Sequence, residues 1–282
     1  MKKLLLSIMV TVLASVCCSG SSDAGGEGNE AKMPATLILA GSGSNLPITR
    51  ILAEAFMQAH PEINIEIPPS IGTRGAIQAI VDGAIGIGLI SRPLAREERK
   101  TGLTILPYAR TGVVIGVNPT VEEEEISFVD LVNIYRGKKA RWKDGHEIIV
   151  LTREPGDSSI DVLRREVPGF EEAYDESLKA RRWTVLFTDQ RMNQAIEDIP
   201  YAMGISDMGS IASEHLNIKI LKLNGQLPTV NSLFNGGYPL LKDLSFVYMD
   251  RKLPEGAEEF LNYVKSKEGA ELLRAYGYLD LN

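Results

Sequence analysis

Cysteine and histidine are scarce in this sequence, which restricts the chemistry open to it. The two cysteines, Cys17 and Cys18, are adjacent and near the N-terminus, so the rest of the 282 residues has no thiol for a disulfide or a metal site. The three histidines, His60, His146 and His215, are far apart along the chain, which argues against a histidine-rich metal centre. We therefore expect neither a metal site nor a bound cofactor.

The chain also lacks an excess of positive charge. It has 30 basic and 37 acidic side chains, a formal net charge of −7, and this charge becomes more negative if the segment that holds Lys2 and Lys3 is removed. A general surface for nucleic acid or for anionic lipid is therefore excluded. With 44% apolar and 24% charged residues the composition is that of a globular protein, and the length suits one large or two medium domains.

One long apolar run is present, at 4–16, directly after Lys2 and Lys3. This arrangement is typical of an export signal, and the run is too short to remain as a membrane span. We predict a signal peptide at 1–17, a flexible Gly-rich and Ser-rich linker at 18–33, and a mature protein in the periplasm or cell envelope.

The cysteines allow two ways of processing this signal. A cysteine after such a run resembles the lipid-attachment site of bacterial lipoproteins, and residues 13–15 (LAS) fit that pattern, but Val16 intervenes before Cys17. Lipidation at Cys17 or Cys18 and plain cleavage therefore both remain open, and a lipid anchor would be the only contact with the membrane.

From residue 35 onward, segments with strand and helix patterns alternate. Their order predicts an α/β protein with a parallel arrangement at its start. We expect strands at 36–40, 63–67, 86–91, 112–117, 148–152, 201–206 and 244–249, and helices at 47–60, 73–82, 127–135, 158–166, 190–198 and 255–276.

Three turns share one construction, in which a strand leads through small polar residues into a helix. They are GSGSN at 41–45, SIGTRG at 70–75 and REPGDSS at 153–159. The first N–H groups of a helix lack partners and carry positive partial charge, so each turn could hold an anion, although each alone could equally be an ordinary helix cap. Three such turns, with Arg92 and Arg153 beside them, favour a shared oxyanion pocket.

The order of several motifs resembles a known family. GSGSN, SIGTRG, GLISRPL, YRGKKARWKDG, REPGDSS and YAMGISDMGSI occur in this order, and the chain ends in FLNYVKSKEGAELLRAYGYLDL. Together they resemble the phosphate-binding, type II periplasmic solute-binding proteins of ABC transporters. The resemblance implies two α/β lobes, each with a mixed sheet flanked by helices, and a ligand cleft between them. We place lobe one at 34–115 and 243–282, and lobe two at 116–242.

The resemblance also implies the ligand contacts. Hydroxyl and backbone N–H donors would come from both lobes and an arginine from the second, at Ser42, Gly43, Ser44, Ser70, Gly72, Thr73, Arg153, Ser158 and Ser159. For Arg153, a surface ion pair with Glu154 is the alternative.

The sequence departs from the family at two positions. Phosphate-specific members commonly have Ser-Asp where this chain has Ser91-Arg92, and that aspartate accepts the proton of hydrogen phosphate. Asp157 stands where the family has a serine, so it either replaces the missing acceptor or caps the following helix. Arg92 and Asp157 thus join the candidate ligand-binding residues, and phosphate is preferred over other tetrahedral oxyanions by a reduced margin.

The sequence favours one function over two others. We expect a monomeric, non-enzymatic solute-binding protein that delivers phosphate or a related oxyanion to the permease subunits of an ABC transporter. An exported oxyanion sensor or adhesion module on the same fold is the alternative. A serine hydrolase is not expected, because none of the three histidines lies in a turn that would orient it as a general base.

Export makes the first testable prediction. Protein isolated from the native host should lack the first 16 or more residues, because the run at 4–16 marks a signal that is removed. Intact-mass spectrometry measures this directly and shows added acyl mass if a cysteine is lipidated. A mature pool that still begins at Met1 would refute export.

Overall fold

The computed structural model describes residues 35–281. The predicted signal peptide, both cysteines and the linker lie outside these residues. Among the described residues, ten strands form one mixed sheet. Its main path runs β2 (Ile63–Glu66), β1 (Ala35–Gly41), β3 (Ile87–Ile90), β11 (Leu241–Tyr248), β4 (Thr104–Val117), β8 (Ala202–Asp207), β6 (Ile149–Arg153) and β7 (Thr184–Leu186), and β9 (Lys219–Ile220) and β12 (Leu279–Asp280) both pair with β4.

The strand directions change at the two long strands in the middle of the sheet, β11 and β4. β1 is parallel to β2 and β3, and β6 is parallel to β7 and β8. Between these two parallel groups, β11 runs antiparallel to β3 and β4, and β4 runs antiparallel to β8. The sheet is therefore mixed: a group of parallel strands lies on each side of the antiparallel β4–β11 pair. A separate two-stranded sheet pairs β5 (Glu125–Ile126) with β10 (Lys222–Leu223).

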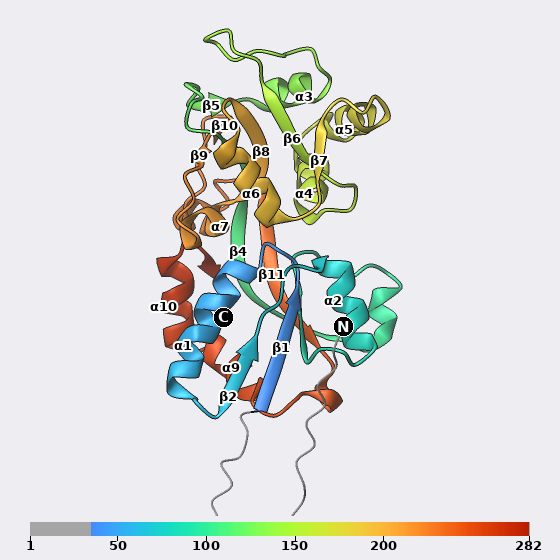
Figure 1. Ribbon diagram of the computed structural model, residues 1–282, viewed down its shortest axis with the longest axis vertical. Helices are drawn as coiled ribbons and strands as arrows, with labels where there is room; N and C mark the ends of the chain where they lie inside the picture. The colour runs from blue at the N-terminus through green and yellow to red at the C-terminus, as the bar shows by residue number, and fades with distance from the viewer. Residues whose placement is uncertain (1–34, 282) are drawn as a thin grey trace, which may run out of the picture. The chain divides into compact units, whose positions relative to one another are not determined.

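The two largest of the four hydrophobic clusters among the described residues divide the elements into two lobes. One core contains residues from Leu37 to Ala109 and from Leu244 to Tyr278, and the other contains residues from Val113 to Leu240. We call the elements around them the first and the second lobe. Figure 1 shows β4 and β11 running from one lobe into the other. Both strands pass from one core to the other near residues 115/116 and 242/243, where the sequence places the lobe boundaries. The exact boundaries remain a prediction.

The helices pack on the two halves of the sheet. The first lobe has α1 (Leu46–Ala59), α2 (Gly72–Val81), α9 (Ala257–Val264) and α10 (Lys267–Ala275), with the 3₁₀ turns η1 (Glu98–Thr101) and η2 (Asp250–Lys252). The second lobe has α3 (Phe128–Tyr135), α4 (Ser158–Glu166), α5 (Phe170–Lys179), α6 (Asp189–Asp198), α7 (Met208–Ser213) and α8 (Val230–Phe234). Each of the longer helices buries one apolar face; in α1 this face includes Leu52 and Phe56.

Each predicted strand and helix has a counterpart in the structure, but β4 begins at Thr104 and not at 112, and the single helix at 255–276 was wrong. The segment forms two helices, α9 and α10, which are separated at Ser266. The Ser266 hydroxyl accepts the backbone N–H of Gly269 at 3.2 Å and so caps a new helix. The helices α5, α7 and α8, the short strands β5, β7, β9, β10 and β12, and both 3₁₀ turns were not predicted.

The shared sheet predicts that the C-terminal half does not fold alone. A fragment of residues 116–282 should lack a cooperative unfolding transition, because β11 needs β3 and β4 as neighbours and α9 packs its Phe260 against Phe56 of α1. Thermal unfolding of the purified fragment, followed by circular dichroism beside the mature chain, measures this. A sharp transition in the fragment would show a contiguous domain and overturn the lobe assignment.

Candidate anion-binding site

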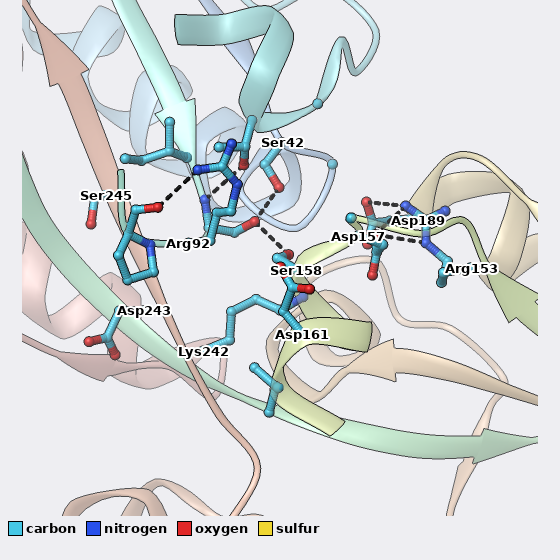
Figure 2. A pocket seen from close by; sticks show the side chains of 18 of the residues that line it. Ser42, Arg92, Arg153, Asp157, Ser158, Asp161, Asp189, Lys242, Asp243 and Ser245 are labelled. Atoms are coloured by element: carbon cyan, nitrogen blue, oxygen red, sulfur yellow. Dashed lines mark hydrogen bonds and ion pairs between the residues drawn. The ribbon is translucent and has the colours of Figure 1, made fainter. Parts of the chain in front are cut away.

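A cleft of about 1280 Å³ lies where the three predicted turns meet. Both lobes line it, and all the candidate ligand residues of the sequence analysis contribute to its lining except Ser44 and Ser159, which lie behind it against Lys242. Figure 2 shows the side chains at its floor. Among the described residues no group of His, Cys, Asp and Glu has the arrangement of a metal site.

Three hydroxyl groups form a chain across the cleft. The Ser91 hydroxyl is hydrogen-bonded to that of Ser42 at 2.7 Å and to that of Ser158 at 2.8 Å. Ser42 and Ser91 belong to the first lobe, and Ser158 is the first residue of α4 in the second. All three are almost fully buried. Ser91 was not among the predicted contacts, yet it joins the two lobes at this point.

The second turn, 70–73, supports the cleft wall. The Ser70 hydroxyl donates to the carbonyl oxygen of Gly41 at 2.9 Å and accepts the N–H of Gly72 at 3.3 Å. The Thr73 hydroxyl accepts the N–H of Ser91 at 3.2 Å. The Ser70 proton is therefore used to tie the second turn to the first, whereas the Thr73 proton has no acceptor among these bonds.

Arg153 is buried and paired, but not with Glu154. It is 4% exposed, and its Nε and Nη2 donate to Oδ2 of Asp157 at 3.0 and 2.7 Å. The other oxygen of Asp157 accepts the N–H groups of Ser159 and Ile160 at the start of α4. Burial would raise the pKa of Asp157, but Arg153 and Lys242 outweigh it and the pKa is lowered. The helix-cap alternative for Asp157 is confirmed.

Arg92 lines the cleft, but its charge is already paired. Its two terminal nitrogens donate to the two oxygens of Glu98, each at 2.8 Å, and one also donates to the carbonyl of Pro93. The hydrogen bond from Arg92 lowers the pKa of Glu98. Figure 2 shows this guanidinium well apart from that of Arg153. Both arginines line the same cleft, each paired with a carboxylate, and a joint action on one anion remains a prediction.

Lys242 is the cation that sequence reasoning missed. It lies on β11 between the two cores and is 2% exposed. Its Nζ donates to the hydroxyls of Ser44 at 2.9 Å and Ser159 at 2.6 Å, and lies 2.9 Å from Oδ1 of Asp207. Burial would lower the pKa of Lys242, but the surrounding carboxylates raise it, so the amine stays charged.

Lys242 also orients its two serine partners. An ammonium group only donates hydrogen bonds, so the hydroxyl oxygens of Ser44 and Ser159 act as acceptors here. Their own protons must point elsewhere, and Ser44 directs its proton toward Asp189 at 3.3 Å. The two predicted serines are thus held in place by a residue that neither turn contains.

Comparison with known proteins agrees with this architecture. A family model described as a PBP superfamily domain matches residues 27–268. This chain belongs to the PBP superfamily. The predicted fold class, a two-lobe α/β protein with mixed sheets and a cleft between the lobes, is confirmed.

Relatives within the superfamily cover nearly the whole chain at low identity. The phosphate-binding protein PstS of Bacillus subtilis is 24% identical over 95% of this chain and 91% of its own length. Protein SphX of Synechococcus elongatus is 26% identical, over 89% and 80% of the two chains. A solved structure from Clostridium perfringens with bound phosphate superposes with a TM-score of 0.77 at 23% identity, covering 88% of this chain and 100% of that one. At that identity the superposition shows a shared fold.

The Lys242–Asp207 pair generates a prediction about stability. Lys242→Met should lower the free energy of unfolding by about 3–5 kcal/mol, because it leaves the carboxylate of Asp207 buried without a counter-charge. The double variant Lys242→Met with Asp207→Asn should recover much of that loss. Urea denaturation at neutral pH measures both.

Lys252→Met, at an exposed position of η2, is the matched control and should change stability little. If the single and double variants lose equal stability, the unpaired carboxylate of Asp207 does not cause the loss of stability in Lys242→Met.

Proposed function

We propose that this chain is an extracytoplasmic solute-binding protein. It captures phosphate, or a similar tetrahedral oxyanion, between its two lobes and delivers it to the permease subunits of an ABC transporter. The names of the relatives, phosphate-binding proteins that align over nearly the whole chain, support the ligand class. The proposal includes no chemical step on the ligand.

The convergence of donors from both lobes carries this proposal. Ser42, Ser44 and Thr73 from the first lobe and Arg153, Ser158 and Ser159 from the second all lie at one cleft or directly behind it. The first residues of α2 and α4, Gly72, Thr73 and Ser158, line the same space. An oxyanion accepts hydrogen bonds on every oxygen, so a ring of donors from two sides suits its recognition.

The placement of the donors supports closure around the ligand. An anion held by both lobes shifts the protein toward a closed form, because it makes its full set of contacts only there. β4 and β11 are the segments that cross between the lobes beside the cleft, so they are where a hinge would lie. A permease that recognises the closed form would then accept only loaded protein.

The cellular setting belongs to the same proposal. The signal-like segment at 1–17 would place the mature chain in the periplasm or cell envelope, free or anchored through a lipid on Cys17 or Cys18. None of the described helices is both long enough and apolar enough to cross a bilayer.

Calorimetric titration of the purified, ligand-stripped protein tests the ligand class. Phosphate, sulfate, arsenate, molybdate and tungstate are compared at one pH. We expect phosphate and arsenate, which share shape and protonation, to bind with similar affinity and to rank first. An absence of heat with all five anions would rule out the proposed function.

Arg153 and Arg92 should differ in importance. Arg153→Ala should weaken phosphate binding at least about tenfold, because a charge-assisted hydrogen bond contributes about 1.5–3 kcal/mol and the buried Asp157 is left facing the ligand. Arg92→Ala should change affinity much less, since its guanidinium is held by Glu98. Calorimetry on both variants measures this, with circular dichroism as the check on folding. Equal losses would contradict the assignment of Arg153.

A further inference from the structure

The carboxylate of Asp189 lies where the first turn meets Arg153. Asp189 is the first residue of α6 in the second lobe. One of its oxygens accepts the Ser44 hydroxyl of the first lobe at 3.3 Å, and the other lies 3.5 Å from Nη2 of Arg153. A side chain at position 43 would overlap this carboxylate, so the glycine is what lets it approach the turn.

The neighbouring residue holds the same contact from the other side. Nε2 of Gln190 donates to the carbonyl oxygen of Gly43 at 3.3 Å. The start of α6 thus reaches across the cleft and bonds to the turn at 43–44 through two consecutive side chains. A carboxylate between donor groups of one lobe and a guanidinium of the other occupies the kind of position that suits an oxyanion.

A count of the buried charges makes Asp189 the unbalanced one. Arg153 is bonded twice to Asp157, and Lys242 is paired with Asp207. The charges within each of these two pairs cancel. The Asp189 side chain, which is 16% exposed, adds a third carboxylate beside them. The charged groups that influence it come from every neighbouring element: Arg153 of β6, Asp157 before α4, Asp207 of β8, Glu214 after α7 and Lys242 of β11.

The surroundings of Asp189 favour its protonated form. Burial raises its pKa most, and the nearby carboxylates of Asp157 and Asp207 raise it further, against the opposing effects of Arg153 and Lys242. An anion that enters the cleft adds negative charge at short range and pushes in the same direction.

We propose that the Asp189 carboxylate is an internal anion that competes with the ligand, and that the site captures an oxyanion only when a proton neutralises Asp189. This inference rests on the proposed function. The proton comes from solvent and adds to the carboxylate, and no other bond is made or broken. The neutral carboxyl group then donates its proton instead of repelling the anion.

The direction of the pH effect follows from this exchange. If Asp189 is ionised in the free protein and protonated in the complex, each pH unit above its pKa in the free protein weakens binding by about tenfold. Asp189→Asn removes the competing charge permanently, so the variant should bind more tightly than the wild type at high pH and should lose this advantage at low pH.

The test compares the dissociation constants of inorganic phosphate for the mature wild type and Asp189→Asn from about pH 8 to about pH 5. Phosphate itself changes its protonation in this pH range. This change affects both dissociation constants equally, so their ratio does not depend on it. We expect the variant to bind at least about tenfold more tightly near pH 8 and the ratio to approach one as the pH falls. Calorimetry in two buffers of different ionisation enthalpy should show about one more proton taken up by the wild type than by the variant near pH 8.

The matched control is Asp198→Asn, at the exposed C-terminal end of α6, which should leave both the affinity and the proton uptake unchanged. Asp189→Ala is a second variant without the carboxylate and serves if Asp189→Asn does not fold. Wild type that binds phosphate while the folded variant binds no more tightly near pH 8 overturns the inference and leaves the proposed function standing. Weaker binding by the variant would overturn it in the same way, since Asp189 would then be an acceptor for the ligand. Absence of binding by all forms at every pH would overturn the proposed function as well.

Discussion

The buried ammonium of Lys242 is the constraint around which the site is built. A charge this deep is tolerated only when its surroundings supply a counter-charge and acceptors for its protons. Asp207 provides the charge, and the hydroxyls of Ser44 and Ser159 provide the remaining acceptors. Because these partners come from three separate segments, satisfying one lysine fixes the first turn, the start of α4 and the end of β8 around a single point.

The proposed binding of an anion in the cleft depends on the arrangement of polar groups more than on net charge. Its two buried cations are each matched to a carboxylate, so the surplus at the floor is negative unless Asp189 is protonated. What the site presents is a set of hydroxyl groups already held in place: the chain of Ser42, Ser91 and Ser158, and the two serines bonded to Lys242. Donors fixed before binding do not lose conformational entropy on capture, and in a region with little water their dipoles act strongly.

Local patterns in the sequence predicted what depends on local physics. The alternation of apolar residues gave the main strands and helices, and Asp157 directly before Ser158 marked a helix cap that the structure contains. Lys242 carries no such signal, since its partners lie 198, 83 and 35 residues away. The pairing of Arg92 was missed for a related reason: its guanidinium is bonded to Glu98 in the 3₁₀ turn that follows, and the Ser91-Arg92 motif does not reveal this contact. The register of β11 against β4 decides where Lys242 lies, and no short motif encodes it.

Lys242 belongs both to the candidate site and to β11, one of the two strands that cross between the lobes. Its contacts therefore affect how the lobes could separate. Lys242 on β11 contacts Ser44 of the first lobe, but Asp207 and Ser159 of the second. If the lobes part and Lys242 stays with Asp207, the ammonium keeps its counter-charge and gives up a hydroxyl contact that water can replace. The same holds for Arg153, whose bond to Asp157 lies wholly within the second lobe. Both ion pairs therefore survive opening, and the contacts that must break across the cleft are hydroxyl bonds, the bond from Gln190 to the Gly43 carbonyl and the approach of Asp189 to Ser44. An opening that exposes no unpaired charge costs little free energy. The equilibrium between open and closed forms would therefore depend mainly on the ligand and on the charge of Asp189.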